Sequence, residues 1–275
     1  MNFKKVIFEL SRKGFVPKKH LGQNFLLDKN IADFIVRVAD VEDKNVLEIG
    51  GGLGILTLPL ANVARNLVVI EKDRTLFEFL REKFAPFSNV EILLGDIMEV
   101  DLKSLFRGEE YSIVSNLPYS ITSPLLFKLW DEEPKVVRVV IMIQYDVALR
   151  LLGKNKRDRS PLFVLYSLTH DVRFLKKVPS GVFWPRPKVD SAIVELTFKE
   201  KVDDELKPIL RKIVDSAYRY RRKVIEKALS MDMDDIDWRS VLLAVNIDPT
   251  LRAEDLLPRD YLSIALHLKI CLNRN

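Results

Sequence analysis

The chain has 275 residues, of which 48% are hydrophobic and 30% charged, with a formal net charge of +5. This composition is typical of a soluble globular protein with one large domain, or one domain and a smaller one. The one cysteine, Cys271, excludes an internal disulfide framework, and the three histidines, His20, His170 and His267, lack metal-ligand spacing. We see no signal peptide and no run of about 18 apolar residues that could cross a membrane, so we expect a cytoplasmic protein without a metal.

Basic residues gather in three parts of the chain. Residues 1–30 hold seven Lys or Arg against two acidic residues, and two further groups lie at residues 154–159 and 219–223. Clusters of this kind suit a phosphate backbone, although many charged runs are only solvated faces. The members are Lys4, Lys5, Arg12, Lys13, Lys18, Lys19, Lys29, Lys154, Lys156, Arg157, Arg159, Arg219, Arg221, Arg222 and Lys223.

Residues 1–30 form a predicted basic arm that ends in Leu21-Gly22-Gln23-Asn24-Phe25-Leu26-Leu27. Small and amide residues beside apolar ones indicate a segment that docks on the protein body and touches a ligand. A frayed terminus is the alternative. Apolar residues at helical spacing between Ile31 and Val38 then predict a helix, with Asp28 as its N-cap.

A glycine-rich turn separates the first two predicted strands. The buried strand Asn45–Ile49 runs into Gly50-Gly51-Gly52-Leu53-Gly54, and after a short helix the strand Leu67–Ile70 ends at Glu71, 21 residues after Gly50 (71 − 50). Glycines allow close backbone approach, and a carboxylate at this offset accepts both hydroxyls of a ribose. A dinucleotide would need its diphosphate seated on a helix N-terminus, whereas S-adenosylmethionine has no phosphate and tolerates this looser glycine pattern. We therefore expect S-adenosylmethionine as cofactor.

The next two strands also end in polar side chains. Val90–Leu94 leads to Gly95 and Asp96, and Tyr111–Ser115 leads to Asn116. Asp96 could accept a hydrogen bond from an adenine amino group, or could instead cap the following segment. Because open α/β sheets bind ligands at the carboxyl ends of their strands, we expect one site formed by four strand ends. These are Gly50, Glu71, Asp96 and Asn116.

The stretch Asn116-Leu117-Pro118-Tyr119 suits methylation of an exocyclic amine. The lone pair of adenine N6 is delocalised, and an Asn oxygen with a backbone carbonyl can accept its two N–H bonds and favour a tetrahedral nitrogen. A Tyr ring offers a stacking surface worth about 1–3 kcal/mol, and proline restricts the backbone. An ordinary turn after a strand is the alternative. The predicted site contains no His or Cys, and transfer needs no strong base because the amine becomes acidic as it attacks.

The remaining chain completes the sheet and adds helices. We expect strands at 136–143, 172–178 and 189–198, helices at 144–152 and 161–170, and an irregular segment at 181–188. Phe183, in the irregular segment, either packs in the core or sandwiches a base against Tyr119. After the charged linker Lys199–Asp204, amphipathic patterns that begin near Leu206, Trp238 and Tyr261 predict a small helical domain. We expect this domain to face RNA through the basic group around Arg221.

Six stretches together resemble one family over nearly the whole chain: Lys18–Leu26, Glu48–Gly54, Asn116–Tyr119, Phe183–Val189, Arg221–Lys223 and Arg252–Leu256. The family is the small-subunit ribosomal RNA adenine N6,N6-dimethyltransferases, the KsgA family. The resemblance implies an α/β class I S-adenosylmethionine-dependent methyltransferase fold: a Rossmann-like seven-stranded sheet with strand seven antiparallel, and a small all-helical C-terminal domain. It divides the chain into an arm (1–30) that closes over the cofactor, a methyltransferase domain (31–200) and an RNA-binding domain (201–275).

The resemblance also implies roles for individual residues. Cofactor binding would involve Asn24, Leu26, Gly50, Glu71, Asp96 and Asn116. The target adenine would meet Asn116, Leu117, Pro118 and Tyr119, with Phe183 flanking it. RNA would be bound by Lys18, Lys19, Arg221, Arg222 and Lys223. The implied substrate is two adjacent adenines near the 3′ end of 16S ribosomal RNA in an assembling small subunit, each doubly methylated, and we expect a monomer.

The chain departs from the usual family pattern at Ser120, Tyr145 and Asp146 and over Leu162–Ser167. Two rivals stay open. One is a large-subunit ribosomal RNA adenine methyltransferase of the antibiotic-resistance type, against which Arg252–Leu256 argues. The other is a ribosome-assembly factor in which binding matters more than catalysis. A nicotinamide-dependent dehydrogenase is disfavoured, because no group for proton transfer stands beside the turn.

Overall fold

The computed structural model describes residues 3–12, 14–132 and 134–272, and the chain divides into two compact units. Unit 1 comprises Met1–Ala148 and Arg173–Phe198, and unit 2 comprises Leu149–Val172 and Lys199–Asn275. The sequence-based division placed residues 149–172 with the sheet. They instead belong to the helical unit, because α7 (Pro161–Thr169) packs against α8 (Leu206–Arg219) and α11 (Pro258–Leu272).

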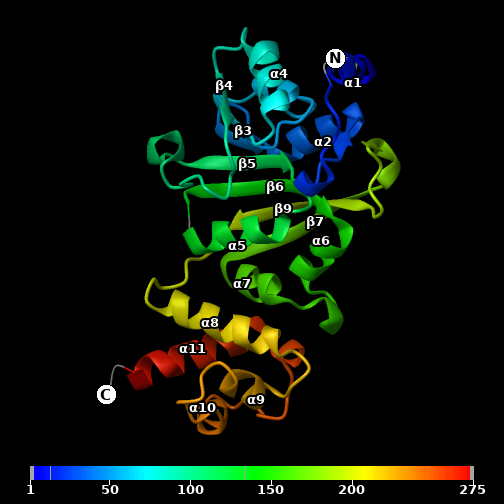
Figure 1. Cartoon of the computed structure of the whole chain (residues 1–275). Coiled ribbons are helices and arrows are strands. Elements are labelled where there is room, and N and C mark those ends of the chain that lie inside the picture. Colours follow the sequence, from blue (N-terminus) through cyan, green and yellow to red (C-terminus); the bar gives the residue numbers. More distant parts are fainter. Residues whose placement is uncertain (1–2, 13, 133, 273–275) are drawn as a thin grey trace. The chain divides into compact units, whose positions relative to one another are not determined.

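A seven-stranded sheet in the order β4-β3-β2-β5-β6-β9-β7 organises unit 1 (Figure 1). Neighbouring strands from β4 to β6 pair in parallel, and β9 runs antiparallel to β6. The expected α/β sheet with an antiparallel closing strand is therefore confirmed. The strands are β2 (Asn45–Ile49), β3 (Asn66–Glu71), β4 (Val90–Leu94), β5 (Tyr111–Asn116), β6 (Val136–Gln144), β7 (His170–Val178) and β9 (Ser191–Phe198).

The central strands are buried because helices cover the sheet. All five residues of β2 and the first five of β5 are buried, as expected for parallel strands with near-continuous apolar runs. Helix α2 (Lys29–Ala39) contacts β5 and β6, and α4 (Arg74–Phe84) contacts β3 and β4. The predicted N-cap of α2 is confirmed, since Asp28 accepts a hydrogen bond from Ile31 N at 3.2 Å. The remaining helices are α3 (Thr57–Ala61), α5 (Thr122–Glu132) and α6 (Tyr145–Leu152), with a 3₁₀ turn at Leu105–Gly108.

The described part of the N-terminal arm is docked on the body of unit 1. Helix α1 (Phe3–Arg12) buries Val6 and Leu10 in a small apolar cluster with Phe15, Phe25, Leu53 and Leu76. Further along, β1 (Phe25–Leu26) pairs antiparallel with β8 (Phe183–Trp184). The expectation of an irregular segment at 181–188 is wrong for these two residues, because the arm supplies a strand partner that the local sequence does not show.

Unit 2 contains five whole α-helices, and the last turn of α6, among its described residues. The predicted helices beginning near Leu206, Trp238 and Tyr261 are confirmed as α8, α10 and α11, and α7 was also expected. Helices α9 (Ile225–Ser230) and α10 (Trp238–Ala244) contact one another, and α8 contacts α9 and α11. Two 3₁₀ turns, η3 (Lys156–Asp158) and η5 (Ala253–Asp255), also contact each other. Within the described ranges, no helix has the length and apolar character needed to cross a membrane.

Candidate active site

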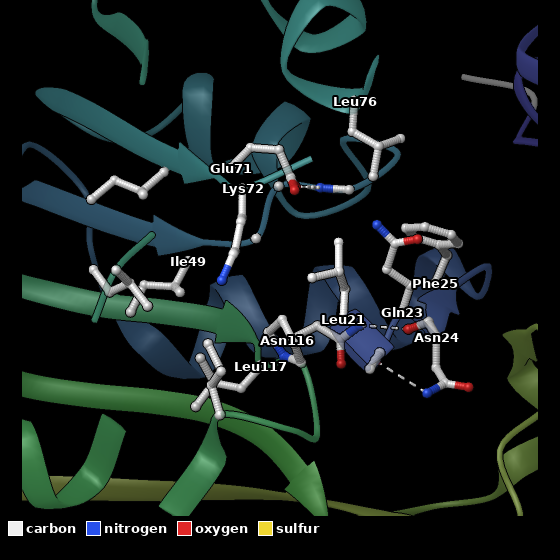
Figure 2. Close-up of a pocket in the computed structure, with 18 of the residues that line it drawn as sticks. Leu21, Gln23, Asn24, Phe25, Ile49, Glu71, Lys72, Leu76, Asn116 and Leu117 are labelled. Atoms are coloured by element: carbon white, nitrogen blue, oxygen red, sulfur yellow. Dashed lines mark hydrogen bonds between the residues drawn. The ribbon is translucent and has the colours of Figure 1, made fainter. Parts of the chain in front are cut away.

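One pocket opens at the carboxyl ends of the parallel strands, where the sequence placed a site. Its lining includes all four predicted strand-end residues, Gly50, Glu71, Asp96 and Asn116, which are up to 66 residues apart in the chain (116 − 50). The arm forms a further wall through Asn24 and Leu26 and their neighbours (Figure 2). All six residues expected at the cofactor therefore line the same cavity.

The glycine-rich turn brings its backbone close to β3. A Cβ atom on Gly51 would lie 2.7 Å from a methyl of Val69 and 2.8 Å from a methyl of Leu80, so no side chain fits there. Gly50 N donates to Ile70 O at 2.8 Å, which fixes the start of the turn against the end of β3. The turn thus forms a narrow floor of backbone beneath the pocket.

Glu71 is held by the turn that it faces. Its Oε2 accepts from Gly52 N at 3.0 Å and its Oε1 from Asp73 N at 2.9 Å, and only 6% of the residue is exposed. Burial raises the pKa of Glu71, and these two backbone donors oppose that rise. The carboxyl is oriented before any ligand arrives, which suits acceptance of ligand hydroxyl groups.

Asp96 makes the capping contact that the sequence offered as one of its two roles, and the contact with an adenine amino group stays a prediction. Its Oδ1 accepts from Met98 N at 3.0 Å, as in a cap, while its Oδ2 lies 2.5 Å from Lys72 Nζ. The hydrogen bond from Lys72 lowers the pKa of Asp96 and keeps it ionised. Figure 2 shows the Lys72 side chain extending into the pocket from the end of β3. An adenine amino group that donates to Asp96 would therefore share or replace the contact made by Lys72.

Glu48, at the end of β2, is a third carboxyl in the pocket wall. It is only 1% exposed, and its Oε2 has no hydrogen-bond partner among the described residues. Burial raises the pKa of Glu48 from its ordinary 4.5 to about 8, and the negative charge of Glu71 adds to this effect. The protein therefore buries a polar group at the pocket wall without satisfying it, which is unusual away from functional sites.

Asn116 is fixed from both sides. Next to it, Ser115 Oγ donates to Ile49 O at 2.6 Å and Leu117 N donates to Met142 O at 3.1 Å, so β5 holds the backbone. Its own Nδ2 donates to Asn24 O of the arm at 3.2 Å. The docked arm thus sets the direction of the amide and leaves Oδ1 as the acceptor end.

Pro118 and Tyr119 continue the wall beyond Asn116. The Pro118 carbonyl accepts from Ile121 N at 3.2 Å and from Thr122 Oγ1 at 3.4 Å, which leaves the Leu117 carbonyl as the candidate backbone acceptor for an amine. Tyr119 Oη lies 2.6 Å from Ser191 Oγ, and burial raises the pKa of this phenol. The tyrosine is therefore neutral and anchored at its hydroxyl end, as a stacking surface should be.

A second set of contacts locks the arm onto the wall. Gly22 has a φ of +67°, and a Cβ there would lie 2.9 Å from Ser120 N, so the arm needs glycine at this close approach. Asp73 is the other anchor: its Oδ2 accepts from Gln23 Nε2 at 3.3 Å and from Lys18 Nζ at 2.8 Å. Its Oδ1 caps α4 through Thr75 N at 3.0 Å and Leu76 N at 3.3 Å. Burial alone would raise the pKa of Asp73, but the donors from Lys18, Leu76 and Gln23 outweigh it and hold the pKa below its ordinary value.

Other predicted residues lie elsewhere. Phe183 does not line the pocket; it is 5% exposed and belongs to the main core cluster, so its contact with a base stays a prediction. Lys18 is engaged by Asp73, and the side chain of Lys19 lies outside the described part of the structure. The expectation that the site holds no histidine is wrong, because the arm residue His20 lines the pocket.

Sequence reasoning missed several pocket residues and their partners. Lys72 and Asp73 directly follow the predicted acid Glu71, and Glu48 lies two residues before Gly50, so proximity in the chain was the available signal. Gln23 gave no such signal, since its partner Asp73 is 50 residues away. Contacts across that distance depend on how the arm folds back.

The lining charges show which cofactor the pocket fits. Glu71, Asp96 and the protonated Glu48 line it together with Lys72, which pairs with Asp96, so Glu71 is the carboxyl without a cationic partner among the described residues. A diphosphate would add negative charge beside Glu71, whereas the sulfonium and ammonium groups of S-adenosylmethionine would bring positive charge to it. The unsatisfied Glu48 Oε2 also fits a ligand that carries a hydrogen-bond donor. The fold and this site define a class I S-adenosylmethionine-dependent methyltransferase.

Comparison with known proteins shows to which family of methyltransferases the chain belongs. The chain belongs to the ribosomal RNA adenine dimethylase family, whose sequence profile matches residues 14–269. It is 38% identical over 261 residues to the ribosomal RNA small subunit methyltransferase A of Desulforapulum autotrophicum, with 92% of each chain covered. It is 37% identical over 273 residues to the protein of the same name from Moorella thermoacetica, with 94% of each covered.

Solved structures show the same fold. A dimethyladenosine transferase from Plasmodium falciparum superposes with a TM-score of 0.76 and 24% identity, covering 90% of this chain and 98% of that one. The 23S rRNA methyltransferase ErmE superposes with a TM-score of 0.67 and 25% identity, covering 89% and 99%. The fold expected from the sequence is thereby confirmed over most of the chain.

Replacing the buried Glu48 by Gln tests its protonation. In the unfolded chain this carboxyl ionises above its ordinary pKa of 4.5, whereas in the folded protein it keeps its proton up to about pH 8. The raised pKa therefore lowers stability as pH rises between these values, by at most about 1.4 kcal/mol per pH unit. We expect Glu48→Gln to gain stability relative to wild type between about pH 5 and about pH 7.5 in urea unfolding. An equal difference at both pH values would contradict this, and Glu82→Gln on the exposed face of α4 is the control.

Replacing Asp73 by Asn tests the arm anchor without removing the cap. Asn keeps an oxygen for the α4 donors but loses the charge that holds Lys18 and Gln23. We expect faster tryptic cleavage after Lys18 and about a tenfold weaker affinity for S-adenosylmethionine by calorimetry, which is ~1.4 kcal/mol. The matched control is Asp28→Asn at the cap of α2. Wild-type cleavage and affinity in Asp73→Asn would show that the arm is held by other contacts.

Proposed function

We propose that this methyltransferase acts on small-subunit ribosomal RNA, where it converts two adjacent adenines near the 3′ end to N6,N6-dimethyladenosine during subunit assembly. The relatives named small subunit methyltransferase A match over more than nine-tenths of their length. The observation that carries the proposal is the placement of Asn116: its amide is oriented by the arm, and it lines the same pocket as Gly50, Glu71 and Asp96.

The residues assigned to the cofactor supply fixed acceptors. Glu71 would hold the ribose hydroxyls and Asp96 the adenine amino group, with Gly50 and Leu26 forming the walls and the arm residue Asn24 orienting Asn116. When bound, S-adenosylmethionine supplies an electrophilic methyl group on its sulfonium. Positioning and electrostatics are what the chain itself contributes.

The target adenine would be held by Asn116 Oδ1 and the Leu117 carbonyl, which together accept the two N–H bonds of N6. This draws the lone pair out of the ring and toward the methyl group, and N6 loses a proton to solvent after each attack. Tyr119, anchored on Ser191, would stack on the base, and Pro118 stiffens the turn between them. Phe183 stays the predicted flank of the base, although its side chain is buried in the main core cluster.

RNA outside the pocket would be bound by basic side chains. Arg222 and Lys223 are exposed and suit this role. Lys18 could contribute only by leaving Asp73, and Lys19 stays a prediction. We further propose a monomer, since one chain supplies every wall of the pocket, and the cytoplasm, where a ribosomal RNA substrate would be met.

One other substrate is favoured by an observation. ErmE, described as a 23S rRNA methyltransferase, shares the fold at a TM-score of 0.67, so large-subunit RNA is the second candidate. The names of the sequence relatives favour the small subunit.

Replacing Asn116 by Ala removes the acceptor for the amine. We expect the turnover number to fall by about 10²–10³-fold, as for the loss of one transition-state hydrogen bond, while affinity for S-adenosylmethionine changes by less than about tenfold. Single-turnover methyl transfer and calorimetry measure the two effects, with Asn62→Ala on an exposed helix end as control. Near-normal turnover would remove Asn116 from the mechanism.

Nucleoside mass spectrometry tests the proposed substrate. Unmodified small-subunit particles are incubated with the protein and S-adenosylmethionine, and large-subunit particles serve as the comparison. Dimethyladenosine at two adjacent positions near the 3′ end of the small-subunit RNA is the expected product. Modification confined to large-subunit RNA would favour the second candidate, and tight particle binding without methylation would favour an assembly factor.

A further inference from the structure

Two basic segments of unit 2, residues 154–159 and 219–223, contain cations with different surroundings. Arg221, Arg159 and Lys156 are engaged inside the unit, each bonded to the segment Arg252–Leu256. By contrast, four exposed cations of these two segments form no ion pair among the described residues. They are Lys154, Arg157, Arg222 and Lys223, called here the free cations.

Arg221 behaves as a clamp. Its Nε donates to Glu254 Oε2 at 3.2 Å, and its Nη2 donates to the carbonyl oxygens of Lys156 at 3.1 Å and Arg157 at 3.0 Å. One guanidinium therefore joins the end of α8, the turn η5 and the basic loop 153–160. A planar fork with fixed donor directions can do this, whereas an ammonium cannot match it.

Two more contacts hold the same loop. Arg159 Nη1 donates to Glu254 O at 2.9 Å, and Lys156 Nζ lies 2.7 Å from Asp255 Oδ1. The hydrogen bond from Lys156 lowers the pKa of Asp255 and keeps this pair ionised. The stretch Arg252–Leu256, which is one of the six stretches that carry the family resemblance, thus supplies the acceptors that hold the basic loop.

The clamp places the free cations together. Arg157 and Lys154 lie on the loop whose carbonyls Arg221 holds, and Arg222 and Lys223 follow Arg221 directly. Arg221 thus holds together two segments that carry exposed like charges. Like charges repel, so this arrangement costs stability unless a polyanion offsets the charge. Regularly spaced phosphates of RNA are the partner that this chemistry fits.

We propose that the free cations form one phosphate-binding surface for the RNA, and that Arg221 is a positioning residue that holds this surface in shape. This inference rests on the proposed ribosomal RNA substrate, and it changes the expected role of Arg221 from RNA contact to support. The surface binds backbone and not bases, so it contributes affinity and orientation without sequence preference.

The test measures affinity as a function of salt for a transcript of the 3′ region of small-subunit ribosomal RNA. Arg222→Gln and Arg157→Gln should each weaken binding and reduce the slope of log K against log salt by about one contact. They should raise KM for the RNA while leaving kcat and the affinity for S-adenosylmethionine unchanged. Arg239→Gln, which removes an exposed cation paired with Glu226, is the control and should leave the slope unchanged.

Arg221 is distinguished from a contact residue by substitution with Lys. A phosphate contact would survive Arg221→Lys, since the charge is kept, whereas a clamp would not. We expect Arg221→Lys to bind RNA as weakly as Arg221→Gln, and the double variant with Arg157→Gln to bind about as weakly as Arg221→Gln alone, because the loop is already released.

Three outcomes would overturn the proposal: unchanged slopes in Arg222→Gln and Arg157→Gln, wild-type affinity in Arg221→Lys, or full additivity in the double variant. If Arg221→Gln does not fold, the exposed Arg222 and Arg157 variants still decide whether the surface exists. Failure of the wild-type protein to methylate the small-subunit particles would instead count against the proposed function, independently of these slopes.

Discussion

The hydrogen bond from Asn116 Nδ2 to the carbonyl of Asn24 is the contact on which the site depends. It joins a rigid strand end to the N-terminal arm and decides which end of the amide faces the pocket. The arm can make this contact only while it is docked, and three features dock it: the close approach of Gly22 to Ser120, the anchor at Asp73, and the β1–β8 pair. Cofactor pocket and acceptor geometry are therefore formed by the same closure.

The charge of the pocket follows from the same construction. Three carboxyls converge where strand ends meet, and burial would make all of them costly if they were ionised and unpaired. The cost of burial is reduced in a different way for each carboxyl: backbone donors hold Glu71, Lys72 pairs with Asp96, and Glu48 keeps its proton. A cationic cofactor would add positive charge beside Glu71, which has no cationic partner among the described residues.

The parts of the fold set by local pattern could be predicted from the sequence. Apolar runs gave the strands, Asp28 gave the start of α2, and the ends of successive parallel strands gave Glu71, Asp96 and Asn116 as one site. What the sequence could not give depends on contacts between distant segments. The pairing of Phe183 with Leu26, the position of His20 at the pocket and the engagement of Arg221 all arise from such contacts. A basic triplet looks the same in sequence whether its members bind RNA or support a loop.

The most direct measurement is a crystal structure of the protein with S-adenosylhomocysteine and an adenine-containing fragment of the substrate RNA. The account predicts the adenine N6 at about 3 Å from Asn116 Oδ1. Asn116 Nδ2 should still donate to the Asn24 carbonyl, and the arm should be closed over the cofactor. An adenine bound with Asn116 turned away, or with the arm released and the base still in place, would contradict the claim that the arm orients the acceptor.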